Sequence, residues 1–297
     1  MTALTVPIAL TIAGSDPSGG AGIQADLKTF SAFGIYGATI ITALTAQNTH
    51  GVSGVFPISP DFIAAQFHSV VSDLDVSAIK TGMLGDVGTV ETVSRLLAEI
   101  PNVPVVVDPV MVATSGDVLL PADAIDAVRR VLIPRAQLIT PNIPEASRLL
   151  DCSEATTEDE MRRQAEALMA FGCGSVLVKG GHGAGADAVD VFFDGREHHI
   201  FRRPRLVTCN THGTGCTLSA AIAAGLADGK PLPDAVEAGK LYVWCALEAG
   251  ANLYIGGGNG PVDHNFALRK AYFHCMPFDP CEAHLLRARI SVVRLAH

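Results

Sequence analysis

Hydrophobic runs and amphipathic stretches alternate along most of the chain. Six apolar or β-branched runs each end in Gly, Asp, Pro or Asn, and they lie at 8–16, 38–48, 77–84, 103–110, 136–142 and 175–181. Continuous apolar strands of this kind are typical of a parallel sheet that is buried on both faces. The pattern therefore predicts an α/β fold with a mostly parallel central sheet.

Helical patterns fill the intervals between these runs. The stretches 60–74 and 121–133 each begin with proline near the first turn, and 157–172 opens with a capping box made by Thr157 and Glu160. The alternation of strand and helix predicts a doubly wound α/β domain with right-handed crossovers.

Polar residues end the apolar runs, where a sheet of this kind binds its ligand. In open α/β sheets, ligands occupy the crevice beyond the carboxyl ends of the strands. The polar residues in question are Asp16, Gln47, Asp108, Asn142 with Glu145, and Lys179. We expect them to converge on one edge of the sheet.

Composition narrows the class of protein. The 297 residues are 48% hydrophobic and carry a net charge of −9, which suits one large domain and not the basic face of a nucleic-acid binder. No apolar run reaches the roughly 18 residues of a membrane span, and the N-terminal stretch lacks the basic residues of a secretory leader. Seven scattered cysteines do not form a disulfide pattern. We expect a cytoplasmic protein with neither nucleic acid nor membrane as a partner.

Two glycine-rich stretches lead into helical patterns. In 210–225, Gly213 and Gly215 mark a sharp turn into a helix of small residues, with Cys216 at the join. Free N–H groups and the helix dipole make such a terminus an anion site. An ordinary strand-to-helix turn with a buried cysteine is the alternative. The stretch 14–30 is a second glycine loop, which lacks the order of a P-loop and is weak evidence alone.

The remaining polar residues match the needs of phosphoryl transfer, which are positioning, a cation site, a cradle for charge and a base. Asn142 and Glu145 suit a hydrated Mg²⁺ held through water, and Lys179 can steady phosphates as a point charge. Taken singly, Glu145 could be a first-turn helix acid, Asp108 a turn residue and Lys179 a solvated strand end.

Seven segments occur in the order and approximate spacing of bacterial hydroxymethylpyrimidine/phosphomethylpyrimidine kinases, of the ribokinase-like superfamily. They are "TIAGSDPSGGAGIQADLKTFSAFGIYG", "TALTAQNT", "KTGML", "VVDPVM", "TPNIPEA", "VLVKGGH" and "THGTGCTLSAAIAA". The resemblance implies a three-layer α/β/α sandwich over 1–272. It also implies ATP and Mg²⁺ as cofactors, and two successive phosphorylations of 4-amino-5-hydroxymethyl-2-methylpyrimidine in thiamine biosynthesis.

The resemblance also implies roles for individual residues. The anion hole comprises Gly213, Thr214, Gly215 and Cys216, with Cys216 where most superfamily members have an aspartate base. The metal side has Asp108 and Glu145, and the nucleotide side has Lys179 and Thr208. The pyrimidine pocket comprises Gly14, Asp26, Gln47, Met83 and Val110.

The pocket chemistry can be argued from the residues themselves. The Gln47 amide offers the acceptor and donor that complement an aminopyrimidine edge, and Met83 offers an adaptable wall for a flat ring. A strand cap and plain core packing are the alternatives. A helix N-terminus can lower the pKa of a thiol towards neutrality. We therefore expect Cys216 to be partly thiolate and to take the proton of the substrate hydroxymethyl group.

Two C-terminal features depart from the family pattern. The run "GPVDHNF" (260–266) stands where the family usually has G-P-x-N-H-F, which leaves its local geometry open. The tail 273–297 loses the strand and helix rhythm and is expected to be an appendage. Its His274, Cys275, Cys281 and His284 fit no standard zinc spacing.

Other functions remain open at this point. Pyridoxal kinase is the nearest, because pyridoxal is also a flat heteroaromatic alcohol. A cysteine-dependent acyl transferase would use Cys216 with His212 and Asn210, and a binding protein without catalysis is the third possibility. Homodimers are common among relatives, so a homodimer is expected by analogy.

Overall fold

The computed structural model describes residues 5–112, 116, 119–181, 183 and 185–269. Residues up to His264 belong to one compact unit. The tail predicted at 273–297, with His274, Cys275, Cys281 and His284, lies outside the described residues. The tail and its boundary at 272 stay predictions.

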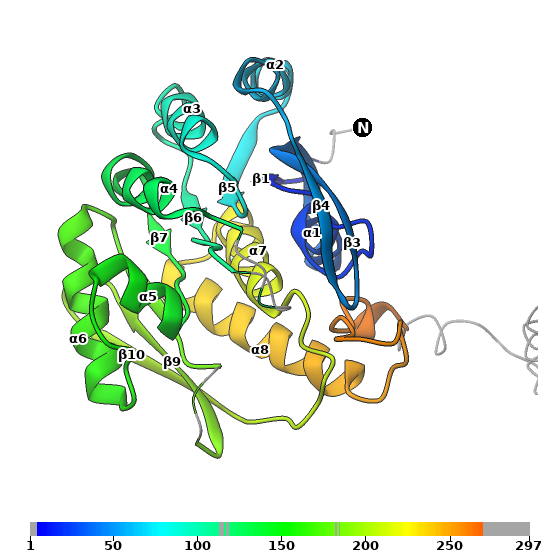
Figure 1. The fold of residues 1–297 in the computed structure, drawn as a ribbon, viewed down its shortest axis with the longest axis vertical. Coiled ribbons are helices and arrows are strands. Elements are labelled where there is room, and N and C mark those ends of the chain that lie inside the picture. Colours follow the sequence, from blue (N-terminus) through cyan, green and yellow to red (C-terminus); the bar gives the residue numbers. More distant parts are fainter. Residues whose placement is uncertain (1–4, 113–115, 117–118, 182, 184, 270–297) are drawn as a thin grey trace, which may run out of the picture. The chain divides into compact units, whose positions relative to one another are not determined.

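An eight-stranded sheet forms the centre of the unit (Figure 1). Its order is β10-β9-β8-β7-β6-β5-β1-β2, with parallel pairs from β2 to β8 and antiparallel pairs from β8 to β10. The prediction of a mostly parallel sheet is confirmed. The strands are β1 (Ile8–Ala13), β2 (Tyr36–Ile41), β5 (Val76–Thr81), β6 (Val105–Val107), β7 (Leu138–Ile139), β8 (Val176–Lys179), β9 (Asp187–Phe193) and β10 (His198–Pro204).

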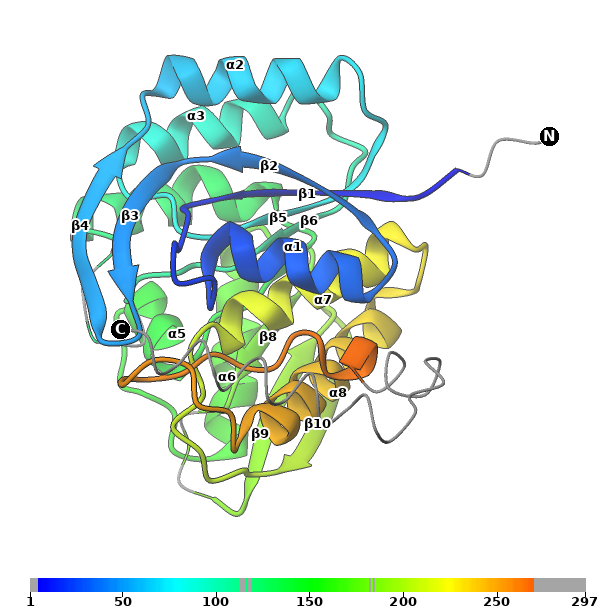
Figure 2. The same ribbon diagram turned by 90° about the vertical axis from the view of Figure 1, so that its right-hand side faces the viewer.

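Helices cover both faces of the sheet and complete three layers (Figures 1 and 2). One layer holds α2 to α6, and the other holds α1, α7 and α8. Their bounds are α1 (Gly22–Ala32), α2 (Pro60–Val71), α3 (Val87–Leu97), α4 (Ala122–Ala127), α5 (Ile143–Leu150), α6 (Glu158–Leu168), α7 (Thr214–Ala227) and α8 (Leu232–Gly250). No helix in the described ranges has the length and apolar character to cross a membrane.

The predicted helix starts are confirmed. Ser59 caps α2 by accepting a hydrogen bond from the Phe62 N–H, with Pro60 in the first turn. Thr157 and Glu160 form the expected capping box on α6. The stretch predicted at 121–133 begins as α4, and π-helical and 3₁₀ turns then extend it to residue 135.

The run predicted as one strand at 38–48 is two strands in the structure. β2 ends at Ile41, and β3 (Ala43–Asn48) leaves the main sheet and pairs antiparallel with β4 (Gly51–Pro57). Thr42 fixes the break because its hydroxyl donates to the Met83 carbonyl at 2.7 Å. The apolar pattern continues through the break, so it does not reveal the change of sheet. We call β3 and β4 the ribbon.

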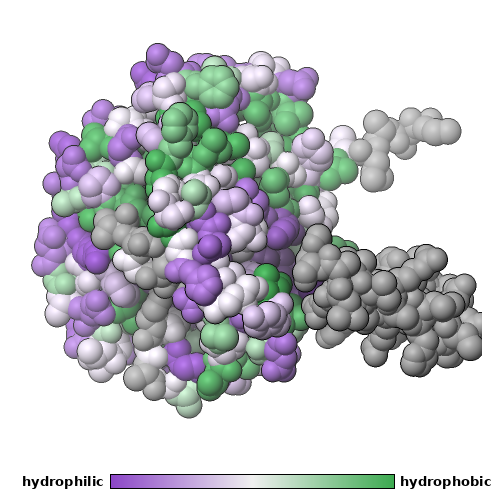
Figure 3. Space-filling view, turned by 45° about the vertical axis from the view of Figure 1, so that its right-hand side comes forward, coloured by the Kyte–Doolittle hydropathy of each residue, from purple (hydrophilic) through white to green (hydrophobic). Residues whose placement is uncertain are grey.

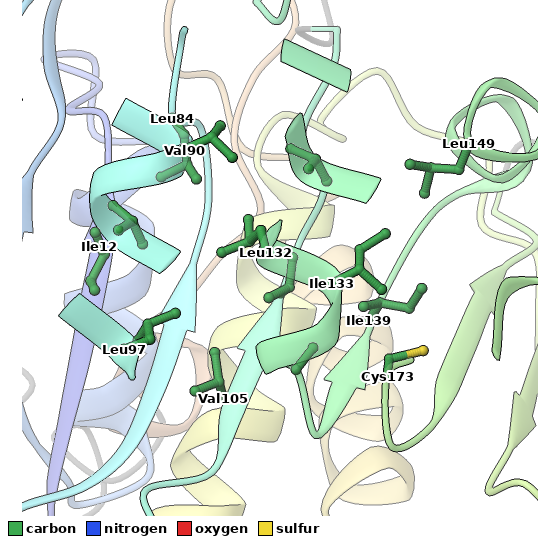
Figure 4. Packing of buried hydrophobic residues seen from close by; sticks show 14 of the residues in the cluster. Ile12, Leu84, Val90, Leu97, Val105, Leu132, Ile133, Ile139, Leu149 and Cys173 are labelled. Carbon is green, nitrogen blue, oxygen red and sulfur yellow. The ribbon is translucent and has the colours of Figure 1, made fainter. Parts of the chain in front are cut away.

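The main hydrophobic core lies between the sheet and the layer of α2 to α6 (Figure 4). Val90 and Leu97 of α3 pack there with strand residues such as Ile12, Val105 and Ile139, all buried. Each such side chain contributes about 1.5–3 kcal/mol when fully buried. On the opposite face, α7 consists mostly of small residues and sits deep, which brings its N-terminus to the carboxyl edge of the sheet.

Candidate active site

The carboxyl edge of the sheet opens into a cavity of about 590 Å³. This is where a doubly wound sheet is expected to bind a ligand. Most of the sequence-predicted site residues line the cavity. They are Gly14, Gln47, Met83, Asp108, Val110, Glu145, Lys179, Gly213, Thr214, Gly215 and Cys216.

Asp26 is not among the lining residues, although the sequence suggested it for the pyrimidine pocket. Its carboxylate is fully buried, accepting hydrogen bonds from Lys80 Nζ at 2.8 and 3.0 Å and from Thr11 Oγ1 at 2.6 Å. Burial acts to lower the pKa of Lys80, but the attraction of the Asp26 carboxylate is larger, and the pKa of Lys80 is raised. Lys80 lines the cavity and was missed, although a lysine inside an apolar strand signals a buried ion pair.

Thr208 is the second predicted residue that does not line the cavity. Its hydroxyl accepts a hydrogen bond from the Asn210 N–H at 3.0 Å and donates to the Ala251 carbonyl at 3.4 Å. These bonds join the segment before α7 to the end of α8. Thr208 does not line the cavity, and its predicted contact with a nucleotide is not tested by the structure.

Lys179 joins two predicted carboxylates at the ends of neighbouring strands. Its Nζ lies 2.9 Å from Asp108 Oδ1 and 4.0 Å from Glu145 Oε2. The hydroxyls of Ser219 and Thr140 donate to Asp108 at 3.2 and 3.3 Å. Asp108 and Lys179 are therefore parts of a buried cluster. This argues against the alternative interpretations of Asp108 as a plain turn residue and of Lys179 as a solvated strand end.

Glu145 has two roles in the structure. It forms a capping box with Asn142, whose N–H donates to Glu145 Oε2 at 2.8 Å, so the reading as a first-turn helix acid is also correct. Burial raises the pKa of Glu145 to about 7, while the nearby Lys179 acts in the opposite direction. The cluster thus combines an ammonium group, a carboxylate and a carboxyl group that titrates near neutrality.

This cluster suits a hydrated magnesium ion. Mg²⁺ keeps several waters and is usually held by one or two carboxylates together with substrate phosphates. Asp108 and Glu145 form such a pair. Within the described ranges, no three His, Cys, Asp or Glu side chains come together as a closed metal cage. The donor set therefore fits an ion that arrives with phosphate ligands.

The first turn of α7 lies beside this cluster. A Cβ on Gly215 would lie 3.3 Å from Lys179 Nζ and 3.7 Å from Asp108 Oδ2. The first N–H groups of a helix have no intrahelical acceptor, and Gly215 and Cys216 both line the cavity. The helix terminus and the ammonium of Lys179 therefore form one positively polarised surface.

The two glycine-rich loops contact each other. Gly213 has φ +78°, and a Cβ there would lie 1.8 Å from the Gly20 carbonyl oxygen. A Cβ on Gly20 would lie 2.4 Å from Cδ2 of His212. Only glycine allows this approach. The loop at 14–22, weak as a sequence signal, is thus a wall of the anion site.

Asp16 connects the same two loops through its side chain. Its carboxylate accepts hydrogen bonds from the Ala21 N–H and from His212 Nε2, each at 2.8 Å. Burial acts to raise the pKa of Asp16, but hydrogen bonds from His212, Ser18 and Ala21 outweigh it and lower this pKa to about 2. Because His212 Nε2 is bound to Asp16, this nitrogen does not serve as a base for Cys216, and the acyl-transferase reading loses support.

The expectation that Cys216 is partly thiolate at neutral pH is wrong for the free protein. Burial raises the pKa of Cys216 to about 11, and Asp26 and Asp108 act in the same direction. The charge of Lys80 opposes them without cancelling them. The favourable effect of a helix N-terminus is therefore smaller than the cost of burying a thiolate among carboxylates.

The far end of the cavity has residues that the sequence reasoning missed. Lys240 on α8 pairs with Asp190 on β9 at 2.7 Å, and both line the cavity. Trp244, the single tryptophan, also lines it and donates from Nε1 to the Pro204 carbonyl at 2.9 Å. The sequence did not predict β9. The one sign of a buried charge there is that Asp190 interrupts an apolar run.

The unusual segment at 260–264 packs against the start of α7. The His212 N–H donates to the Gly260 carbonyl at 3.0 Å, and His264 Nε2 lies 2.9 Å from Thr217 Oγ1. Thr217 donates its proton to the Gly213 carbonyl at 2.8 Å, so His264 must be the donor in the second bond. The segment therefore supports the loop that carries the anion site.

A pH prediction follows from His264. Burial and the charge of Lys28 lower its pKa from 6.5 to about 4. Above pH 6.5 the imidazole is neutral in both the folded and the unfolded state. As pH falls towards 4, only the unfolded chain takes up the proton, so the free energy of unfolding should fall by up to about 3 kcal/mol.

Urea unfolding at several pH values checks this prediction. His264→Gln keeps an N–H donor and cannot titrate, so its free energy of unfolding should fall less between pH 6.5 and 4 than that of the unaltered protein. Carboxyl groups titrate in both proteins and drop out of the difference. Parallel pH curves for the two proteins would contradict the assignment.

Comparisons with known proteins show the family of the chain. The sequence profile of the family described as phosphomethylpyrimidine kinase matches residues 16–263. A hydroxymethylpyrimidine/phosphomethylpyrimidine kinase of Rhizobium meliloti is 54% identical over 257 residues, which cover 86% of this chain and 96% of the relative. A chloroplastic thiamine biosynthetic bifunctional enzyme of Arabidopsis thaliana is 48% identical over 93% of this chain and 53% of its own.

A solved structure shares the fold at substantial identity. The ADP complex of Bacillus subtilis pyridoxal kinase is 39% identical, with a TM-score of 0.82, and the match covers 89% of this chain and 99% of that chain. The three-layer architecture is thus one that binds a nucleotide in a relative.

Proposed function

The chain belongs to the phosphomethylpyrimidine kinase family, and on this basis we propose that it phosphorylates 4-amino-5-hydroxymethyl-2-methylpyrimidine and then its monophosphate, with ATP as donor. The product is the pyrophosphate used in thiamine biosynthesis. In each step, a substrate oxygen forms a bond to the γ-phosphorus of ATP, and the bond between that phosphorus and the ADP oxygen breaks.

One observation carries this proposal. The Lys179 ammonium lies 2.9 Å from Asp108 and beside the first turn of α7, where a Cβ on Gly215 would be 3.3 Å from it. A migrating phosphoryl group needs positive charge and N–H donors arranged around one point. No two of these groups are neighbours in the sequence, so their convergence depends on the fold.

The residues have distinct roles in the proposed transfer. Asp108 and Glu145 would hold the hydrated Mg²⁺, which supplies charge neutralisation on the phosphates. Lys179 would bind the transferring phosphoryl oxygens as a point charge. The N–H groups of Gly215 and Cys216 would stabilise the charge that develops on it.

The acceptor side of the cavity is proposed to hold the pyrimidine. Gly14, Met83 and Val110 give it a narrow apolar surface, and a Cβ on Gly14 would lie 2.3 Å from the Met83 methyl carbon. Gln47 offers its amide to the aminopyrimidine edge. Cys216, in its minor thiolate form, would accept the proton of the hydroxymethyl group as the oxygen of that group attacks.

An ATP-coupled assay tests the function directly. ADP should form with hydroxymethylpyrimidine and with its monophosphate, and each reaction should stop when magnesium is chelated. Quenching of Trp244 fluorescence by ATP alone would give an independent measure of nucleotide binding. If ADP forms with pyridoxal but with neither pyrimidine, the proposed substrate is wrong.

Pyridoxal is the second candidate, favoured by the match to Bacillus subtilis pyridoxal kinase. Both alcohols carry a hydroxymethyl group on a flat ring, and the cavity does not exclude either by volume. They differ in their polar edges, because the pyrimidine has an amino group where pyridoxal has its formyl group, and a ring nitrogen where pyridoxal carries its phenol oxygen. We therefore expect kcat/KM to be higher for the pyrimidine.

Association into a homodimer is also part of the proposal. The ribbon exposes Leu44, Val55 and Phe56, and Phe56 keeps 67% of its surface accessible. Figure 3 shows hydrophobic residues grouped on the upper part of this face of the molecule. Contiguous apolar surface favours association. Sedimentation equilibrium tests it, and a monomer at micromolar concentration would refute it. The cytoplasmic location expected from the sequence stays a prediction.

A further inference from the structure

The Gln47 amide lies between two polar neighbours that belong to different parts of the fold. Its Oε1 lies 3.2 Å from Thr45 Oγ1, on the same face of β3, and its Nε2 lies 3.5 Å from His212 Nε2, in the loop before α7. A primary amide can turn by 180° about its last bond and exchange these two atoms. The protons of the neighbours decide which orientation is satisfied.

Thr45 has no proton to give to Gln47. Its hydroxyl lies 2.8 Å from the Ser15 carbonyl oxygen, which can only accept, and a hydroxyl has a single proton. The 3.2 Å contact with Gln47 is longer and faces the lone pairs of Thr45 Oγ1. Thr45 therefore requires a donor, namely the amide nitrogen.

His212 has no lone pair to offer to Gln47. Its Nε2 lies 2.8 Å from Asp16 Oδ2, and this carboxylate is ionised and can only accept. Nε2 must therefore carry the proton. This single proton goes to Asp16, so an amide N–H facing Nε2 at 3.5 Å would find no acceptor, and the amide oxygen is the more favourable neighbour.

Both neighbours thus favour the same orientation. We infer that Thr45 and His212, the latter fixed by Asp16, lock the Gln47 amide with Nε2 towards Thr45 and Oε1 towards His212. The lock leaves one N–H and one oxygen lone pair on the outer edge of the amide, in a fixed order. Thr45 and His212 are positioning residues, and they act on the substrate through Gln47.

This inference deepens the proposed function and rests on it. The amino substrate presents a ring-nitrogen acceptor beside an amino donor. Its 4-oxo analogue presents a ring N–H donor beside a carbonyl acceptor, which is the reverse order. A freely turning amide would accept both compounds, whereas a locked amide accepts one. The network therefore makes Gln47 selective for the order of donor and acceptor on the ring.

The test compares the amino substrate with 5-hydroxymethyl-2-methylpyrimidin-4-one. The unaltered protein should prefer the amino compound by at least about 100-fold in kcat/KM, because the wrong order leaves buried polar groups unpaired. Thr45→Val removes the hydroxyl without changing the shape, and it should lower this preference about tenfold. Thr45→Ser keeps the hydroxyl and should retain the preference.

A merely structural role for Thr45 predicts a different result. In that case Thr45→Val would slow both compounds equally and leave their ratio unchanged, which would overturn the inference. The KM for ATP should stay the same in Thr45→Val and Thr45→Ser, whereas the thermal midpoint should fall only in Thr45→Val, which loses the hydrogen bond to the Ser15 carbonyl. Equal turnover of the two compounds by the unaltered protein would also overturn it.

A second variant reaches the lock from the other side. His212→Gln can keep an N–H donor between Asp16 and Gln47 and should preserve part of the preference, whereas His212→Phe should lose it. Calorimetry measures the affinity of the protein for each of the two pyrimidines, and so tests the lock without turnover. A protein that binds the amino compound selectively but transfers no phosphate would refute the proposed function and support the lock. Equal binding of both compounds, or binding of neither, would overturn the lock.

Discussion

Gly213→Ala is expected to lower kcat/KM for the first phosphorylation by at least about 1,000-fold, since it displaces several anion-binding N–H groups together. The new Cβ would lie 1.8 Å from the Gly20 carbonyl oxygen and 2.8 Å from the carbon that carries it. Backbone atoms cannot rotate away as a flexible side chain does. The two glycine loops must separate, and the first turn of α7 moves with them.

Gly229→Ala is the matched control for this variant. Gly229 has φ +77°, nearly the same as Gly213, and a Cβ there would meet nothing within 4 Å. It should show the cost of left-handed backbone, about 1 kcal/mol, with little loss of activity. Coupled assays and thermal unfolding on both variants separate strain from contact. Similar losses of activity in the two would refute the importance of the loop contact.

Cys216→Ala is expected to slow the first phosphorylation by about 100-fold to 10,000-fold and the second far less. In the first step the nucleophile is an alcohol whose proton must leave. In the second it is a phosphate oxygen, largely ionised at neutral pH, so a base matters less. The informative measurement is the ratio of the two rates in single-turnover experiments.

Cys216→Asp tests the same role from the opposite direction. A thiol with a pKa of about 11 is mostly protonated at pH 7, so the first step of the unaltered protein should accelerate as pH rises from 6 to 9. The same surroundings would raise the pKa of an aspartate, but from a much lower starting value, so the rise in rate should move to lower pH and flatten towards pH 9. If Cys216→Ala slows both steps equally, or neither, the sulfur is not the base.

The strand ends and helix starts could be read from the sequence because each leaves a local signature. Val105–Val107 is an apolar run that stops at Asp108, and the Thr157 capping box marks the start of α6. The break at Thr42 has no such signature, because it depends on a hydrogen bond to Met83, 41 residues away. Long-range contacts decide which sheet a strand joins, and the pattern of one segment does not contain them.

The site also contains features that the sequence predicts and features that depend on long-range contacts. Asp108 directly follows β6, Lys179 ends β8 and Glu145 lies in the first turn of the helix after β7, so the order of the strands predicted that they meet. The prediction of a low pKa for Cys216 was wrong because burial and neighbouring carboxylates, which the sequence does not reveal, raise that pKa. Asp26 was placed in the pocket by resemblance, while its pairing with Lys80 turns it away from the ligand space.

Under the proposed function, the ribbon would separate substrate recognition from phosphoryl transfer. Gln47 and Thr45 project from a two-stranded sheet, whereas Asp108 and Lys179 are anchored at the ends of the eight-stranded one. Substitutions in the ribbon would then alter which alcohol binds without disturbing the residues proposed to act on the phosphoryl group. A scaffold of this kind can diversify in substrate range by drift in one outlying hairpin, and directed evolution of new vitamin-precursor kinases would begin there.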